Sequence, residues 1–208
     1  MKQTIFTLSI FTLFLVACGS EGSKDVAIGT QTWMTKNLNV DEFKNGDAVL
    51  EASTMEEWID ACENKQPAWC YYGNDSSLGV QYGKLYNWYA VNDPRGISPE
   101  GYRIPGKEDW SKLIDYLGGK TAAGKKMKSK NIWEGGAVGT NESGFSAIPG
   151  GFRTSEGFNF FGGSGIWWSS LEINNSVVEG YQIQHFESVY TLNALKNSFG
   201  LSIRCIKD

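Results

Sequence analysis

The stretch that decides the fold covers residues 82–110 and reads YGKLYNWYAVNDPRGISPEGYRIPGKEDW. Leu85, Trp88 and Tyr89 recur at the spacing of one helix face, which predicts a first helix here. Residues 93–96 (DPRG) end it. Pro105 disfavours helical backbone at the residue before it, so residues 101–105 are predicted to be extended.

A second helix is predicted just after this extended piece. Trp110, Leu113, Ile114 and Leu117 form an apolar stripe at helical spacing, and Gly118 and Gly119 close it. We expect the two helices to pack on each other and on a sheet.

The rest of the chain adds local signals around this centre. Residues 26–34 predict a hairpin that turns at Gly29, and residues 54–57 (TMEE) predict a capped helix over 54–63. A short basic helix is expected over 122–130. Short strands are expected over 144–148, 151–154, 166–170, 177–186, 188–192 and 199–207. Because most helices precede most strands, the pattern predicts the α+β class.

The first 25 residues have the composition of an export signal and a tether. Residues 5–16 are mostly apolar but too few for a membrane span, which needs roughly 20 residues. They fit a leader over residues 1–17. The sequence LVAC at 15–18 resembles a bacterial lipobox, which predicts lipidation of Cys18. Residues 18–25 are then a flexible tether, and residues 26–208 are one domain.

The charge balance argues against a nucleic-acid partner. The chain has 19 Lys and Arg against 23 Asp and Glu, a formal net charge of −4. Its basic cluster comprises Lys120, Lys125, Lys126, Lys128 and Lys130. A solvated helix face explains this cluster better than a nucleic-acid site, because the domain as a whole is acidic.

Three cysteines remain after Cys18, namely Cys62, Cys70 and Cys205. An exported chain permits disulfides, and three cysteines allow three single pairings, between which the sequence alone does not choose. Our preferred pairing is Cys62 with Cys70, because they are close in sequence. In the last predicted strand, Phe199, Leu201, Ile203 and Cys205 alternate with Gly200, Ser202, Arg204 and Ile206, so the first four residues are expected on its inward, apolar face.

Several ordered motifs resemble one family, the Fibrobacter succinogenes major paralogous domain, over about residues 26–208. They are residues 28–34 (IGTQTWM), 37–39 (NLN), 82–88 (YGKLYNW), 101–105 (GYRIP), 144–146 (GFS), 149–153 (PGGFR), 167–170 (WWSS) and 202–205 (SIRC). The resemblance implies an exported bacterial lipoprotein at the outer membrane or cell surface. It also implies a C-type lectin-like fold, with two main helices on small antiparallel sheets and long irregular loops.

The same resemblance also indicates a class of function. It favours a non-enzymatic binding module for a glycan or a protein. The alternatives are a structural envelope component and an oxidase of the formylglycine-generating type, which holds copper between two cysteines. Cys205 could match the second of these, but the position five residues earlier is Gly200. The cysteines that many members carry before the GYRIP and YGKLY motifs are missing here, so the resemblance implies that Cys205 is a buried free thiol.

The remaining candidates are aromatic and oxygen-bearing side chains. Exposed aromatic rings bind sugars or protein partners. The candidate ligand-binding aromatics are Phe158, Phe160, Phe161, Trp167 and Trp168. Adjacent strand residues face opposite ways, so one Trp of the pair is expected in the core and the other is a candidate for exposure; packing of both is the alternative.

Oxygen-bearing loop residues complete the candidates. Asn141 and Glu142 are candidate ligand contacts, and Asn74 and Asp75 are weak calcium candidates, although turn formation explains all four better. The single histidine, His185, and the scattered cysteines predict neither a catalytic triad nor a metal centre.

Overall fold

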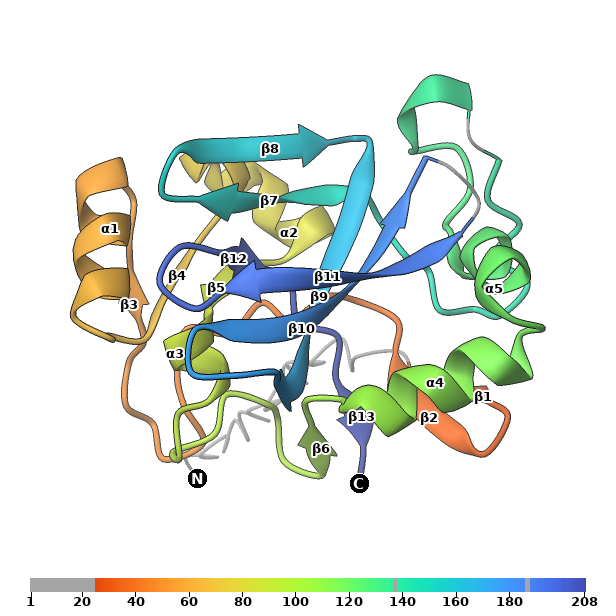
Figure 1. Cartoon of the computed structure of the whole chain (residues 1–208), viewed down its shortest axis with the longest axis horizontal. Coiled ribbons are helices and arrows are strands. Elements are labelled where there is room, and N and C mark those ends of the chain that lie inside the picture. The colour runs from red at the N-terminus through yellow and green to blue at the C-terminus, as the bar shows by residue number, and fades with distance from the viewer. Residues whose placement is uncertain (1–24, 137, 186–187) are drawn as a thin grey trace, which may run out of the picture.

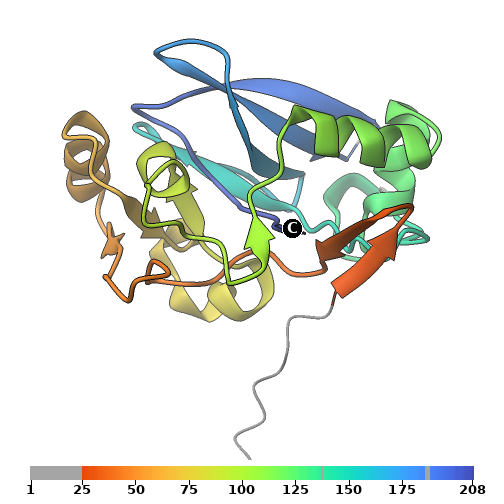
Figure 2. The ribbon, with the colours of Figure 1, turned by 90° about the horizontal axis from the view of Figure 1, so that it is seen from below.

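The computed structural model describes residues 25–136, 138–185 and 188–208 (Figures 1 and 2). Cys18 and the leader expected over 1–17 lie outside these residues. The helices are α1 (Met55–Glu63), α2 (Gly79–Tyr82), α3 (Trp88–Val91), α4 (Lys107–Tyr116) and α5 (Lys120–Met127), with 3₁₀ turns at Tyr72–Asn74, Ser76–Leu78 and Glu134–Gly136. Among them, no helix is both long enough and apolar enough to cross a bilayer.

The strands form two sheets. In chain order they are β1 (Asp25–Ile28), β2 (Gln31–Met34), β3 (Leu50–Glu51), β4 (Ala68–Cys70), β5 (Leu85–Asn87), β6 (Tyr102–Arg103), β7 (Gly150–Thr154), β8 (Gly157–Phe161), β9 (Ser164–Glu172), β10 (Val177–Gln184), β11 (Val189–Leu195), β12 (Gly200–Leu201) and β13 (Ile206–Lys207). The small sheet has the order β1-β2-β13-β6. The large sheet has the order β11-β10-β9-β7-β12-β5-β4-β3, and β8 pairs with β7 beside it.

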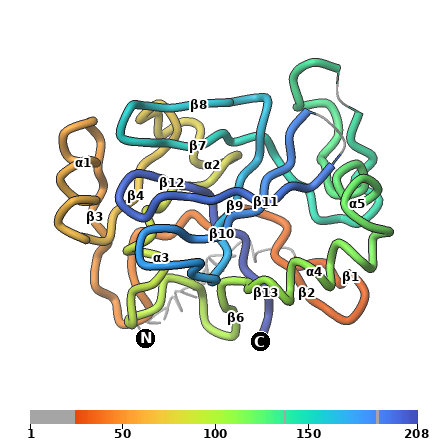
Figure 3. Tube along the Cα trace, in the orientation of Figure 1, coloured from red at the N-terminus to blue at the C-terminus, as the bar shows by residue number. Residues whose placement is uncertain are grey.

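The architecture is α+β, as predicted, but the large sheet is neither small nor wholly antiparallel. It contains nine strands, and the pairs β3–β4 and β7–β9 are parallel. Figure 3 shows how β12, from the end of the chain, lies beside β5 and β7. The sheet is large because these short, distant segments pair with one another.

Local signals placed two helices and one hairpin correctly. β1 and β2 pair around the turn at Gly29. At α1, the Thr54 side chain accepts a hydrogen bond from the Glu57 amide, and the Glu57 carboxylate accepts from the Thr54 amide at 3.0 Å. At α4, the Asp109 carboxylate accepts from the Gly106 amide at 2.8 Å. Side-chain caps satisfy amide groups that a helix start leaves free.

The first predicted helix is wrong over its first turn. Leu85 lies in β5, which pairs with β4 on one side and β12 on the other. The helix begins only at Trp88, because the Asn87 side chain caps it by accepting from the Ala90 amide. Backbone hydrogen bonds to two neighbouring strands outweigh the local helical spacing of the apolar residues.

Two predicted strands also need correction. Residues 144–148 form no strand, although Ala147 makes an isolated bridge with Lys128. The predicted strand over 199–207 is divided into β12 and β13, because its two ends join different sheets. Cys205 is buried in a core cluster, as predicted.

Arg204 alternates with the apolar residues of that last segment and was expected on the opposite face from them, yet it is fully buried. Its guanidinium donates to the Asn37 side-chain oxygen at 2.7 Å and to the Met34 and Phe145 carbonyls. Burial lowers the pKa of Arg204 to about 9. The carbonyl and amide oxygens compensate for the water that the guanidinium loses.

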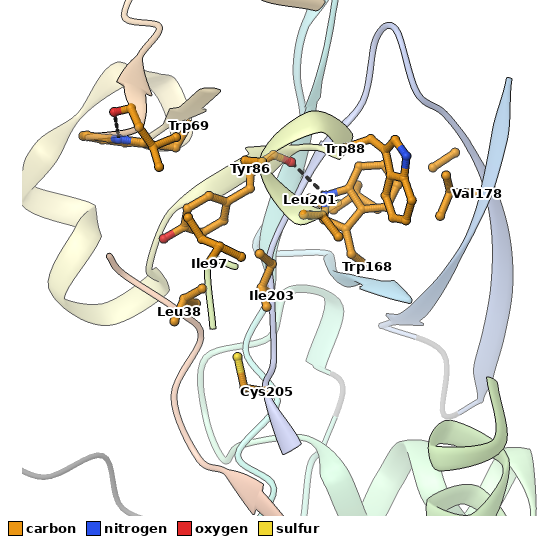
Figure 4. Packing of buried hydrophobic residues seen from close by; sticks show 14 of the residues in the cluster. Leu38, Trp69, Tyr86, Trp88, Ile97, Trp168, Val178, Leu201, Ile203 and Cys205 are labelled. Atoms are coloured by element: carbon orange, nitrogen blue, oxygen red, sulfur yellow. Dashed lines mark hydrogen bonds between the residues drawn. The ribbon is translucent and has the colours of Figure 1, made fainter. Parts of the chain in front are cut away.

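Two large apolar clusters cover the two faces of β9. Trp168 belongs to one cluster with Trp88 and Val178, whereas Trp167 belongs to the other with Trp110 of α4. Figure 4 shows the first cluster, in which the Trp168 indole donates to the Tyr86 carbonyl at 2.8 Å. At β9, both faces of the large sheet are therefore covered by the hydrophobic core.

Candidate functional site

The adjacent tryptophans of β9 are not a surface site. Both Trp167 and Trp168 have an exposed fraction of 0%. The Trp167 indole donates to the Asn37 side chain at 2.8 Å, so both indole N–H groups of the pair are satisfied inside the protein. An exposed member of this pair is therefore excluded, because β9 lies between two strands and between two apolar clusters.

The β7–β8 hairpin separates the three candidate phenylalanines. Phe158 and Phe161 are partly buried and both contact Tyr72, with ring centroids 5.0 and 4.7 Å apart. Phe160 instead contacts Phe152 on β7, with ring centroids 5.9 Å apart and nearly parallel planes. Only Phe160 is largely exposed, at 60%.

The backbone at this point is unusual. Phe160 has φ of +58°, a conformation that costs a bulky residue about 1–3 kcal/mol. Opposite it, Gly151 has φ of +64°, and an added Cβ would lie 2.5 Å from the Asn159 carbonyl oxygen and 2.7 Å from the Tyr72 ring. The glycine therefore permits a close backbone approach, and the hairpin presents the Phe160 ring to solvent.

Phe160 is one end of a three-ring stack. Phe152 lies in the middle, and its other face packs on Phe199 with centroids 5.6 Å apart and planes 2° from parallel. Phe199 is partly buried and lies just before β12. The stack therefore runs from the exposed ring of Phe160 across the sheet to the loop between β11 and β12.

Phe199 also lines a cavity of about 430 Å³, which we call the hairpin groove. The β7–β8 turn and the β11–β12 loop meet α1 there, at the left of Figure 1. The lining residues are Ile59 and Glu63 of α1; Thr154, Ser155 and Glu156 of the hairpin; and Leu195, Asn197, Ser198 and Phe199. Its volume falls in the usual range for small-ligand pockets, about 300–1,000 Å³.

Hydrogen bonds fix two walls of the hairpin groove. The Ser155 amide donates to the Ser198 hydroxyl at 3.1 Å, which joins the hairpin turn to the β11–β12 loop. The Trp58 indole donates to the Ser198 carbonyl at 2.9 Å, which joins that loop to α1. These bonds hold the apolar and polar parts of the groove in place without a ligand.

Asn74 and Asp75 have structural partners near the hairpin. The Asn74 side-chain oxygen accepts from Arg153, whose guanidinium also donates to the Ala52 carbonyl at 3.0 Å. Asp75 caps the 3₁₀ turn at Ser76–Leu78 by accepting from the Ser77 amide at 2.9 Å. No group of three or more His, Cys, Asp or Glu side chains in the described ranges could hold a metal ion.

Asn141 and Glu142 lie away from the aromatic hairpin. The Asn141 side chain forms a turn by accepting from the Ser146 amide at 2.9 Å and donating to its hydroxyl at 3.0 Å. Glu142 is exposed and lines a cavity of about 340 Å³ beside Tyr116 and Lys126. These two residues are therefore not part of the hairpin groove.

A further cavity of about 430 Å³ lies between residues 39–44 and 97–100. Its aromatic residue, Phe43, is 3% exposed, and the Arg95 guanidinium covers the ring at 4.0 Å from its centroid. The aromatic ring of this cavity is therefore almost completely covered. The hairpin groove combines an aromatic wall with polar side chains and is the better candidate site.

The cysteines Cys62, Cys70 and Cys205 are free and buried. The disulfide expected between Cys62 and Cys70 is absent from the structure, although both belong to one apolar cluster. Burial raises the pKa of each of these two thiols to about 11, and that of Cys205 to about 12. Thiols with such pKa values carry little nucleophilic thiolate at neutral pH.

None of the residues that line the hairpin groove was a candidate site residue in the sequence. Phe199 was expected to point inward, and Glu63 and Asn197 carry no local signal. One signal could have been used: residues 154–157 (TSEG) fit a hairpin turn, which would have placed Phe152 and Phe160 on neighbouring strands.

Comparison with known proteins identifies the family. The sequence model described as the Fibrobacter succinogenes major domain matches residues 26–207. Neither the curated proteins nor the solved structures that were compared gave a match. The matched segment covers nearly all of the described residues, from β1 to β13. The chain belongs to the Fibrobacter succinogenes major domain family.

Proposed function

We propose that the chain is a non-enzymatic binding module of the bacterial cell envelope, and that the hairpin groove binds a glycan. One observation carries this proposal: the aromatic residue Phe199 lines a preformed cavity whose other lining residues carry hydroxyl, amide and carboxylate groups. Sugar rings pack their C–H faces on aromatic rings, and their hydroxyls need polar partners. The groove offers both.

Lipidation of Cys18, and hence a membrane partner, is the second part of the proposal. It is supported by the LVAC sequence at 15–18. Asp25, the first described residue, begins β1 in the small sheet, on a different side of the molecule from the β7–β8 hairpin (Figures 1 and 2). Attachment through residues 18–24 would therefore leave the hairpin groove open to a ligand.

The C-type lectin-like architecture also belongs to the proposal. It is supported by the α+β arrangement, in which α4 packs on one face of the large sheet. The oxidase alternative would require a second thiol beside Cys205. Cys205 lies in one core cluster, whereas Cys62 and Cys70 lie in another. This separation favours the binding module over the oxidase.

A glycan array tests the proposal directly. The full chain, purified in detergent, should bind at least one class of glycan, and Phe199→Ala and Asn197→Ala should each weaken binding at least about tenfold. Tyr190→Ala is the control, because Tyr190 is 44% exposed on β11 and does not line the groove. If no glycan bound to the folded chain, a structural envelope role would replace this proposal.

The lipid anchor has its own test. Mass spectrometry of the mature N-terminus should show acylated Cys18, and Cys18→Ser should release the chain from the membrane fraction. An unmodified Cys18 at the mature N-terminus would contradict lipidation without affecting the glycan proposal.

A further inference from the structure

The hairpin groove carries charge of one sign. Among its lining residues in the described part of the chain, the charged ones are Glu63 and Glu156. They come from different elements, since Glu63 ends α1 and Glu156 lies in the turn between β7 and β8. The two carboxylates therefore reach the same cavity only through the tertiary fold.

In the described part of the chain, neither carboxylate forms an ion pair with a basic side chain. Within the described residues, the ion pairs include Lys196 with Glu172 at 2.9 Å and Arg95 with Asp93 at 2.9 Å, but none with Glu63 or Glu156. Lys196 is adjacent in sequence to the groove residues Leu195 and Asn197, yet it is already paired with Glu172. The groove is consequently lined by two acidic side chains that no ion pair within the described ranges joins to a cation.

From this arrangement we infer that the hairpin groove selects uncharged glycans and excludes acidic ones, such as polymers of uronic acids. This inference rests on the proposed function. A neutral sugar offers hydroxyl donors, and ionised carboxylates accept hydrogen bonds more strongly than neutral groups do. A sugar carboxylate offers no donor in the same place and is repelled by Glu63 and Glu156.

The repulsion should be measurable but moderate. The groove is open to solvent, so water screens the charges. The repulsion between a sugar carboxylate and each glutamate is therefore modest. We expect an acidic polymer to bind about tenfold or more weakly than its neutral counterpart at low salt. Raised ionic strength should reduce the difference, because salt screens exposed charges over distances beyond about 10 Å at 0.1 M.

Matched polysaccharides provide the test. Binding of the full chain to galactan, mannan and glucan is compared with binding to polygalacturonate, polymannuronate and carboxymethyl glucan. The double variant Glu63→Gln with Glu156→Gln keeps the shape and an acceptor oxygen at each position but removes both charges. The control is Glu56→Gln, an exposed residue in the first turn of the same helix that does not line the groove.

The inference predicts that the double variant binds acidic polymers at least about threefold better relative to their neutral counterparts, while the control keeps the original preference. Equal binding of acidic and neutral polymers by the parent chain would overturn the charge selection and leave the glycan site standing. An unchanged preference in the folded double variant would also overturn it. Absence of binding to every polysaccharide would overturn both proposals.

Discussion

The two aromatic regions that stand out in the sequence differ in their exposure to solvent. Trp167 and Trp168 in β9 are completely buried, whereas Phe160 in β8 is 60% exposed. The difference follows from the position of each strand. β9 lies between β7 and β10 with a core cluster on each face, but β8 pairs only with β7 and lies beside the main strand order. The exposure of an aromatic residue therefore depends more on its strand's neighbours than on the residue itself.

The two regions also differ in whether their aromatic side chains form hydrogen bonds. Each buried indole donates a hydrogen bond, to Asn37 for Trp167 and to the Tyr86 carbonyl for Trp168. The Phe160 side chain has no polar atom, and its ring stacks on that of Phe152. The tryptophan pair holds two clusters to one strand, while the phenylalanine leaves a ring face available to solvent. Four predictions test this contrast, in order of decreasing effect.

The largest effect is expected for Trp168→Ala. Removing a fully buried indole leaves a cavity and removes the hydrogen bond to the Tyr86 carbonyl, so the free energy of unfolding should fall by about 3–5 kcal/mol. Urea unfolding monitored by circular dichroism measures the loss. Trp168→Phe is the control and should lose less, because it retains most of the apolar volume. A loss below about 1 kcal/mol would show that β9 is not the centre of the core.

Gly151→Ala should have an intermediate effect in the hairpin region. The new Cβ would contact the Asn159 carbonyl oxygen, and the positive φ would strain it, so we expect a loss of about 2 kcal/mol. Gly157→Ala is informative beside it, because Gly157 has φ of +125° but no atom within 4 Å of an added Cβ. If both variants lost the same free energy of unfolding, the positive φ would explain the glycine at 151, rather than the close approach of the neighbouring backbone.

The pH dependence of stability tests whether the Cys205 thiol is buried in the same core cluster as Trp168. Burial raises the pKa of the Cys205 thiol from 9.0 to about 12. Its contribution to stability is complete below pH 9 and is lost as the pH rises toward 12, because the unfolded chain ionises first. Reduced Cys205→Ala should therefore lose stability less steeply than the parent between about pH 8.5 and about pH 10.5. Parallel pH curves would contradict a buried thiol.

The smallest effect is expected for Phe160→Gly. The substitution removes the stacking contact with Phe152, which lowers the free energy of unfolding by about 1 kcal/mol. It also relieves the strain of the positive φ, which raises the free energy of unfolding by about 1 kcal/mol. The melting temperature should stay within a few degrees of the parent value. A loss comparable to that of Trp168→Ala would mean that Phe160 is a core residue and would abolish the contrast between the two regions.

Local sequence predicted those elements whose stabilising contacts are themselves local. The capping box at Thr54 and Glu57, the turn at Gly29 and the apolar stripe of α4 all act within a few residues, and the structure contains each of them. Where partners come from far along the chain, local reasoning failed. Leu85 was expected in a helix but lies in β5, which pairs with β4 and β12, and Arg204 was expected opposite the apolar face but is buried among distant carbonyls.

The sequence by itself therefore determined the α+β class, the capped helices and the motifs of the family. Only the tertiary structure decided which aromatic rings are exposed and where a ligand could bind. The hairpin groove joins α1, the β7–β8 turn and the β11–β12 loop, and hydrogen bonds from Ser155 and Trp58 to Ser198 hold these segments together. Trp58 and Ser198, which lie 140 positions apart, acquire a shared environment only when the fold brings them side by side.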